Sequence, residues 1–151
     1  MTIGFEVNGR PAEVDLDPTT PLLDALRNAL DLKGTRYGCG LEQCGSCMVL
    51  LDGQPIYACT REIGTIAGRR ITTIEGLTGH RLHQAFLDEQ AGQCGYCLSG
   101  IIISAKALLD RNPRPSRTDI VTALDRNLCR CGTHTRIIAA VQKAILMGAL
   151  A

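Results

Sequence analysis

The 151-residue chain has few aromatic side chains and no tryptophan. Aromatic residues make up only 3% of the chain, so most of its core must come from Leu, Ile, Val and Ala. A small domain with a thin core of this kind often needs a covalent or metal staple to be stable. The composition therefore directs attention to side chains that could supply one.

An excess of charge of either sign is also missing. Sixteen basic and fifteen acidic residues give a formal net charge of +1, which predicts neither a nucleic-acid footprint nor a polybasic membrane patch. The opening sequence MTIGFEVNGR has no basic region followed by an apolar one, and no stretch approaches the ~18 apolar residues of a membrane helix. We therefore expect a cytoplasmic protein whose thiols stay reduced.

No Ser-His-Asp set, Walker loop or dinucleotide fingerprint is visible, so we do not expect an active site within this chain. What the chain does contain is eight cysteines. In a reducing compartment so many cysteines favour metal binding, whereas a secreted disulfide module is the alternative. The spacing of the cysteines distinguishes metal binding from a disulfide framework.

The first half of the chain predicts a small mixed β domain. Alternating apolar residues and the turn pairs Asn8-Gly9 and Asp52-Gly53 indicate two hairpins and a closing strand. Thr20 is expected to cap a helix that has Pro21 in its first position and extends to Gly34. The strands are expected at residues 2–7, 10–16, 48–51, 55–58 and 70–74.

Helical periodicity replaces the strand signals after about Gly76. Ser116 is expected to cap the third of four helices, which are expected at residues 82–90, 97–110, 117–127 and 135–148. The sequence therefore predicts an α+β protein with two domains, residues 1–76 and residues 77–151. The second domain is expected to be a compact bundle held partly by a cofactor.

The cysteines fall into two sets of four. The first has the spacing C-x4-C-x2-C followed by a distant fourth cysteine, which is the plant-type [2Fe-2S] arrangement. Thiolates suit iron, and four of them complete two tetrahedral irons. Glycines within this loop let the backbone aim N–H groups at the sulfurs. The predicted ligands of this first cluster are Cys39, Cys44, Cys47 and Cys59.

The second set consists of a C-x2-C pair and a distant C-x-C pair, Cys94 with Cys97 and Cys129 with Cys131. Two such pairs can hold a second [2Fe-2S] cluster, but they can also hold a structural zinc ion in a closed tetrahedral site. A C-x-C pair is unusual for zinc, so the spacing favours iron. The zinc alternative describes a free-standing ferredoxin with a zinc-stapled helical domain.

Three motifs resemble the small iron-sulfur subunit of the xanthine oxidase family of molybdenum hydroxylases. They are YGCG with CGSC at residues 37–47, QCGYC at residues 93–97, and NLCRCGT at residues 127–133. The resemblance covers nearly the whole chain. It implies an N-terminal plant-type ferredoxin-like (β-grasp) domain and a C-terminal four-helix domain, with a [2Fe-2S] cluster in each.

The resemblance also implies partners and a direction of electron flow. In this family a large partner subunit carries a molybdopterin cofactor, and electrons pass from it to the cluster of the helical domain and then to the ferredoxin-like domain. Gln93 and Cys131 match positions that contact the pterin across the subunit interface. The external acceptor is expected to be a cytochrome, a quinone or a further FAD subunit.

Residues 97–109 look closer to the branch of the family that acts on N-heteroaromatic compounds such as isoquinoline or nicotinate. Oxidation of an N-heteroaromatic compound or an aldehyde by the complex is therefore expected. Ser46, Met48 and residues 60–63 depart from the commoner pattern near the first cluster.

Other polar residues are given lesser roles. His80, His83 and His134 are not expected to bind metal, because eight thiolates suffice. Four arginines near the cysteines could soften the negative charge of the clusters, with Arg130 as the strongest candidate; the other three are Arg36, Arg126 and Arg136.

Overall fold

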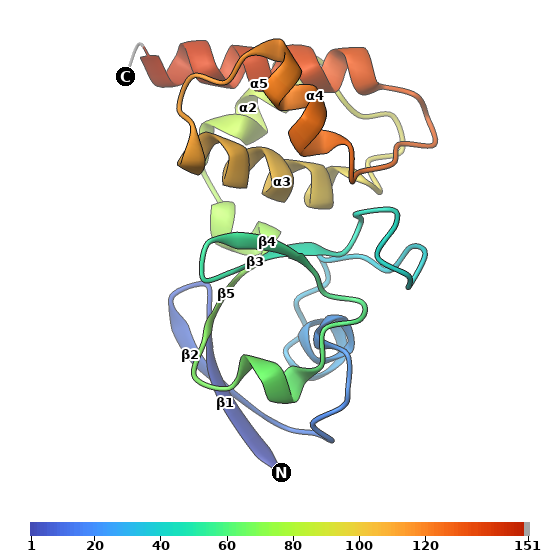
Figure 1. Ribbon diagram of the computed structural model, residues 1–151, viewed down its shortest axis with the longest axis vertical. Helices are drawn as coiled ribbons and strands as arrows, with labels where there is room; N and C mark the ends of the chain where they lie inside the picture. Colours follow the sequence, from blue (N-terminus) through green and yellow to red (C-terminus); the bar gives the residue numbers. More distant parts are fainter. Residues whose placement is uncertain (150–151) are drawn as a thin grey trace.

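The computed structural model describes residues 1–149 and combines a five-stranded sheet with a layer of four helices (Figure 1). The strands are β1 (Thr2–Val7), β2 (Arg10–Asp15), β3 (Met48–Leu51), β4 (Gln54–Tyr57) and β5 (Arg70–Thr72). They lie in the order β2-β1-β5-β3-β4, with β1 parallel to β5 and the other neighbours antiparallel. The predicted α+β class is confirmed.

Both predicted hairpin turns are present, and their backbone explains the residues found there. Asn8 and Gly9 have φ of 51° and 79°, and Asp52 and Gly53 have φ of 49° and 85°. Two successive positive φ angles characterise the turn whose twist matches paired strands, and Asn-Gly and Asp-Gly adopt it most readily. Residue 16, predicted in a strand, lies beyond β2.

The helix predicted between Thr20 and Gly34 is wrong in its extent. The structure has a short turn, α1 (Leu22–Asp24), which continues as a wider π-helical turn, η1 (Ala25–Ala29). Pro21 precedes it without a side-chain cap. The helix ends because Asp31 adopts a φ of 57°, the left-handed conformation with which many helices end, and Leu32 N–H donates back to Leu26 O at 2.8 Å.

The four predicted helices of the second half are confirmed within a few residues at each end. They are α2 (Arg81–Asp88), α3 (Leu98–Arg111), α4 (Arg117–Leu124) and α5 (His134–Ala149). Ser116 caps α4 as predicted, and Asp119 completes a reciprocal capping box. Two 3₁₀ turns, η2 (Ile63–Ile66) and η3 (Ile74–Leu77), were not predicted, and η3 replaces the expected end of β5.

Strand β3 belongs to both hydrophobic cores. Val49 and Leu51 pack with the core of the sheet domain, whereas Met48 and Leu50 pack with the core of the helices. Side chains alternate between the two faces of a strand, so four consecutive buried residues require cover on both faces. The β3-β4 hairpin therefore lies directly against α3 and joins the two halves of the molecule (Figure 1).

Among the helices of residues 1–149, none combines the length and the apolar character that crossing a bilayer requires.

Candidate metal centres

The first cysteine set lies at the open end of the β3-β4 hairpin. Three members are on the loop that leads from η1 into β3, and the fourth follows β4; the set is Cys39, Cys44, Cys47 and Cys59. The hairpin pairs Met48 with Tyr57, and Ala58 N–H donates to Cys47 O at 3.2 Å. Strand pairing thus brings together cysteines that are separated in sequence.

Backbone amides surround the sulfur of Cys39. This Sγ accepts hydrogen bonds from the N–H groups of Leu41, Gln43 and Cys44 at 3.3, 3.2 and 3.3 Å. In return, Cys39 N–H donates to the Sγ of Cys44 at 3.3 Å. Concave arrays of N–H groups stabilise anions, so this loop suits thiolate ligands.

Gly38 leaves room for the sulfurs of the first set. A Cβ at this position would lie 2.5 Å from the Sγ of Cys44 and 3.3 Å from the Oγ of Ser46. The first distance is far below an ordinary contact, so any side chain here would displace a cysteine. The loop is therefore shaped around its sulfur atoms.

The thiols of the first set differ in how readily they ionise. Burial raises the pKa of Cys47 to about 12. Burial also acts on Cys39, but hydrogen bonds from backbone N–H groups outweigh it and lower the pKa of Cys39 to about 7. Only the thiolate is a metal ligand. Cys39 is thus prepared for metal binding, whereas Cys47 needs the positive charge of a metal to ionise.

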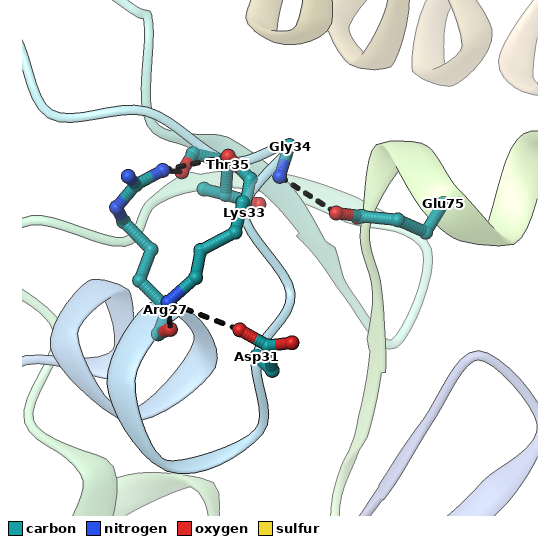
Figure 2. A network of polar contacts seen from close by, with 6 residues as sticks. All are labelled: Arg27, Asp31, Lys33, Gly34, Thr35 and Glu75. Atoms are coloured by element: carbon teal, nitrogen blue, oxygen red, sulfur yellow. Dashed lines mark hydrogen bonds and ion pairs between the residues drawn. The ribbon is translucent and has the colours of Figure 1, made fainter.

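A network of polar contacts anchors the segment that precedes the first set (Figure 2). The guanidinium of Arg27 donates to the carbonyl oxygens of Lys33 and Thr35 at 2.6 and 2.8 Å. On the other side, Gly34 N–H donates to Oε1 of Glu75 at 2.7 Å. Since Glu75 lies in η3, which leads to the helices, this network ties the cysteine loop to the connection between the two halves.

The second cysteine set lies where four helices begin and end. Cys94 and Cys97 are between α2 and α3, and Cys97 is the residue that precedes α3. Cys129 and Cys131 are on the loop between α4 and α5. Packing of these helices therefore positions thiols that are far apart in sequence.

The second set receives hydrogen bonds from a side chain as well as from the backbone. The hydroxyl of Thr133, which is buried, lies 3.3 Å from the Sγ of Cys129. Tyr96 N–H lies 3.5 Å from the Sγ of Cys94. Burial would raise the pKa of Cys129, but the hydroxyl and N–H of Thr133 hold it at about 7. Burial raises the pKa of Cys97 to about 12.

The thiols of both sets fall into neighbouring pairs, since within each pair one thiol contributes to the pKa shift of the other. Within residues 1–149, no three potential ligands converge on the position of a single metal ion. Paired thiols are what a cluster with two tetrahedral irons requires, because each iron takes two protein ligands. The pairs are Cys39 with Cys44, Cys47 with Cys59, Cys94 with Cys131 and Cys97 with Cys129.

The two sets lie against each other. A cleft of about 390 Å³ is lined by Cys44 of the first set and by Cys94, Cys97 and Cys129 of the second. Beside it, Leu128 N–H donates to Cys44 O at 2.9 Å. The protein thus brings Leu128, the residue before Cys129, into direct hydrogen-bonded contact with Cys44.

Two glycines permit this close approach. A Cβ on Gly100, in the first turn of α3, would lie 2.0 Å from the carbonyl oxygen of Gly45. A Cβ on Gly45 would lie 2.5 Å from the carbonyl oxygen of Arg126. In both cases the obstacle is backbone, which cannot rotate away. The helices can therefore dock on the cysteine loop only because both positions lack a side chain.

The remaining residues singled out in the sequence occupy varied positions. Gln93 is exposed, precedes Cys94 and lines a groove that also includes His83 and Arg136. His80 caps α2 by accepting a hydrogen bond from Leu82 N–H at 3.1 Å. Arg130 and His134 line the cleft between the two cysteine sets.

Two of the four arginines are engaged with aromatic rings. The guanidinium of Arg126 lies 5.8 Å from the centre of the Tyr57 ring, and that of Arg36 lies 5.1 Å from the centre of the Tyr96 ring. Sequence reasoning missed the contact of Arg36, as well as the roles of Arg27 and Glu75. No local pattern marks these residues, because their partners are distant along the chain.

Comparison with known proteins agrees with this geometry. Residues 5–68 match the family described as 2Fe-2S iron-sulfur cluster binding domain, and residues 73–142 match the [2Fe-2S] binding domain family. Both clusters predicted from the sequence are thus confirmed.

Two relatives of similar length are subunits of oxidoreductases. The chain is 54% identical to a nicotinate dehydrogenase subunit from Pseudomonas putida, over 95% of this chain and 94% of the relative. It is 45% identical to the alpha subunit of isoquinoline 1-oxidoreductase from Brevundimonas diminuta, over 94% of this chain and 96% of the relative.

A solved structure shows the same fold. It is the structure of quinoline 2-oxidoreductase from Pseudomonas putida 86, and its matching chain is 36% identical, with a TM-score of 0.93. The match covers 99% of this chain and 95% of that chain. Two [2Fe-2S]-binding domains, together with relatives that match over almost their full length, show that the chain belongs to the small iron-sulfur subunits of the xanthine oxidase family of molybdenum hydroxylases.

Proposed function

We propose that this chain relays single electrons from a molybdopterin centre in a large partner subunit, through its two [2Fe-2S] clusters, to an external acceptor. The observation that carries the proposal is the close approach of the two cysteine-bearing loops, which the hydrogen bond from Leu128 N–H, next to Cys129, to Cys44 O joins directly. Two metal sites serve as one electron carrier only if they lie close together.

The proposed ligands follow the thiol pairs. Cys39 and Cys44 would share one iron of the first cluster, and Cys47 and Cys59 the other. The second cluster would be held by Cys94 with Cys131 and by Cys97 with Cys129. A bound [2Fe-2S] cluster stores one electron, and its potential depends on hydrogen bonds to sulfur and on exposure.

The route between the clusters consists of few bonds. From Cys129 it follows one peptide bond to Leu128, crosses the hydrogen bond to Cys44 O at 2.9 Å, and continues through Cys44 to its sulfur. The cleft beside this route is lined by cysteines of both sets. These contacts support electron exchange between the two sites without a further carrier.

The proposed contact with the molybdopterin involves Gln93 and Cys131. Gln93 is exposed beside Cys94, whose pKa is lowered by the N–H of Tyr96 and then by the thiol of Cys131. An exposed amide can offer both donors and an acceptor to a ligand. Electrons would therefore enter the chain at this end of the second set.

The first set would pass electrons on. Its acceptor is proposed to be a FAD subunit or a cytochrome in the same assembly or in contact with it. We place the protein in the cytoplasm, where reduced thiols can be loaded with iron. We place the boundary between the two domains after residue 76, since the two hydrophobic cores divide near Leu77 apart from the shared strand β3.

The proposed substrate of the complex is an N-heteroaromatic compound, with an aldehyde as the second candidate. The relatives from Pseudomonas putida and Brevundimonas diminuta are described as acting on nicotinate and isoquinoline. Substrate oxidation would take place in the partner subunit, so the present chain contributes the path for electrons and not the selection of the substrate.

Metal analysis and spectroscopy of the purified complex test the proposal. We expect about four irons per copy of this chain and two distinct spin-half iron signals in the electron paramagnetic resonance spectrum after reduction. Half of this iron, with zinc in the second site, would instead identify a ferredoxin with a zinc-stapled helical domain. A colourless protein without labile sulfide would identify a disulfide module.

A further inference from the structure

Residues 36–37, just ahead of the first cysteine set, contact residues 95–96, which lie between two cysteines of the second set. The guanidinium of Arg36 donates from Nη1 to Gly95 O at 2.9 Å and stacks over the ring of Tyr96 at 5.1 Å. The hydroxyl of Tyr96 donates to the carbonyl oxygen of Tyr37. Each cysteine loop therefore donates a side-chain hydrogen bond to a backbone carbonyl of the other.

Arg36 is itself fixed to the first loop. Its N–H donates to Ser46 O at 3.3 Å, next to Cys47. The side chain is half-buried and extends toward the other domain. A charged donor forms a stronger hydrogen bond than a neutral one, and stacking on an aromatic ring restricts the guanidinium further. Arg36 thus holds the loop of the first cysteine set and the Cys94–Cys97 loop in a fixed relative position.

The two loops have a second link, which has a different character. Leu128 N–H to Cys44 O, and Asn127 Nδ2 to Gly45 O at 3.3 Å, hold the C-x-C side of the second set. The contacts of Arg36 and Tyr96 hold its C-x2-C side. Because the second set is built from two loops on different helices, fixing one loop does not fix the other.

We propose that Arg36 and Tyr96 form an interdomain clasp, which positions the Cys94-Cys97 loop relative to the first cluster and so sets the rate of electron exchange. The inference rests on the proposed function. The step is a one-electron transfer: the second cluster is oxidised, the first is reduced, and no bond or proton is exchanged. Electron tunnelling weakens steeply with distance, so a small loosening of this loop slows the transfer.

Substitutions of the two residues in the assembled enzyme test the clasp. Tyr96→Phe removes only the hydroxyl, and Arg36→Gln removes the charge and the stack. Tyr37→Phe is the matched control, because it removes a hydroxyl from the adjacent tyrosine but keeps the carbonyl that accepts the hydrogen bond. Iron content and the two separate cluster signals establish first that both clusters are present.

Two measurements then decide the outcome. One is the magnetic interaction between the two reduced clusters, which falls with distance. The other is the rate at which an electron added at the second cluster reaches the first. We expect Tyr96→Phe and Arg36→Gln to weaken the interaction and to slow transfer severalfold, because both quantities fall steeply with distance, while Tyr37→Phe changes neither.

A double-mutant cycle strengthens the test. Because both residues act through the same loop, the double variant is expected to slow transfer no more than the more severe single variant. Unchanged interaction and unchanged rate, with about four irons still bound per chain, would overturn the clasp and leave the proposed function intact. If Arg36→Gln fails to assemble, Tyr96→Phe decides alone. Loss of iron from the unsubstituted protein would instead count against the proposed function.

Discussion

The first cysteine set is held by one loop and a hairpin, whereas the second is held between the ends of four helices. Three cysteines of the first set occur within residues 39–47, and backbone N–H groups supply the hydrogen bonds to its sulfurs. The second set joins residues 94–97 with residues 129–131 and receives a hydrogen bond from the hydroxyl of Thr133. The first site is therefore local in sequence, and the second depends on tertiary packing.

Because of this difference, the first site depends less on the second than the second depends on the first. The backbone of the first loop is fixed by its own hydrogen bonds and by Arg27 and Glu75 (Figure 2). The second site draws its cysteines from two separate loops between helices, so it depends on a bound cofactor and on docking against the first domain. We expect damage to the second site to leave the first intact.

Substitution of Cys131 by alanine tests this independence and has the largest expected effect. An iron deprived of one of its thiolates loses its tetrahedral set, so the second cluster should be lost. Iron should fall from about four to about two per chain, and turnover with physiological acceptors should cease while the spectrum of the first cluster persists. Metal analysis and paramagnetic resonance measure both.

Cys44→Ala is the mirror control for this experiment. It should remove the first cluster and leave the helical domain with its own spectrum. Retention of full turnover in Cys131→Ala would contradict the assigned ligand. Loss of both clusters from either variant would show that the two sites are not independent.

Substitution of Gly100 by alanine tests the docking of the two domains. Alanine in a helix normally stabilises it by up to about 1 kcal/mol relative to glycine. Here the new Cβ would lie 2.0 Å from the carbonyl oxygen of Gly45, so the helix must shift away from the first loop. We expect a net loss of about 1–3 kcal/mol in the free energy of unfolding, measured by chemical denaturation.

Gly148→Ala provides the matched control, since this glycine is also helical. Its new Cβ would meet the flexible side chain of Arg81 at 2.8 Å, and not backbone. A side chain can move, so little stability should be lost. Equal destabilisation by both substitutions would show that close backbone approach at Gly100 is not what limits docking.

The sequence predicted those features that depend on neighbours along the chain. The hairpin turns at Asn8-Gly9 and Asp52-Gly53 were found because positive φ angles demand these residues. The cap at Ser116 was found because its partner, Asp119, is three residues away. The motif spacing also sorted the cysteines into the two sets that the fold brings together.

What the sequence did not predict depends on distant partners. The helix after Pro21 was expected to extend to Gly34, but it ends earlier, where Asp31 takes a positive φ. The shared strand β3 reads as an ordinary apolar run, and only the docked helices explain why all four residues are buried. The contacts of Arg36 with Gly95 and Tyr96 join residues 59 and more positions apart, and no spacing rule reveals them.

The hydroxyl of Thr133 offers a smaller test of how the second site is tuned. With the sulfur of Cys129 bound to metal, this hydroxyl would be the donor and would stabilise the reduced, more negative cluster. Thr133→Val keeps the shape of the side chain and removes the donor. A hydrogen bond of about 0.5–1.5 kcal/mol corresponds to about 20–60 mV for a one-electron couple, so the potential of the second cluster should fall by up to this amount.

Redox titration followed by paramagnetic resonance measures the potentials of both clusters in one sample. The first cluster should keep its potential in Thr133→Val, because its hydrogen bonds come from its own loop. Thr133→Ser should restore the potential of the second cluster, and Thr135→Val, which alters an exposed residue of α5, should leave both potentials unchanged. A rise in potential, or an equal shift in both clusters, would contradict tuning by this hydroxyl, since a lost donor on one sulfur can only disfavour the reduced state of the cluster that it touches.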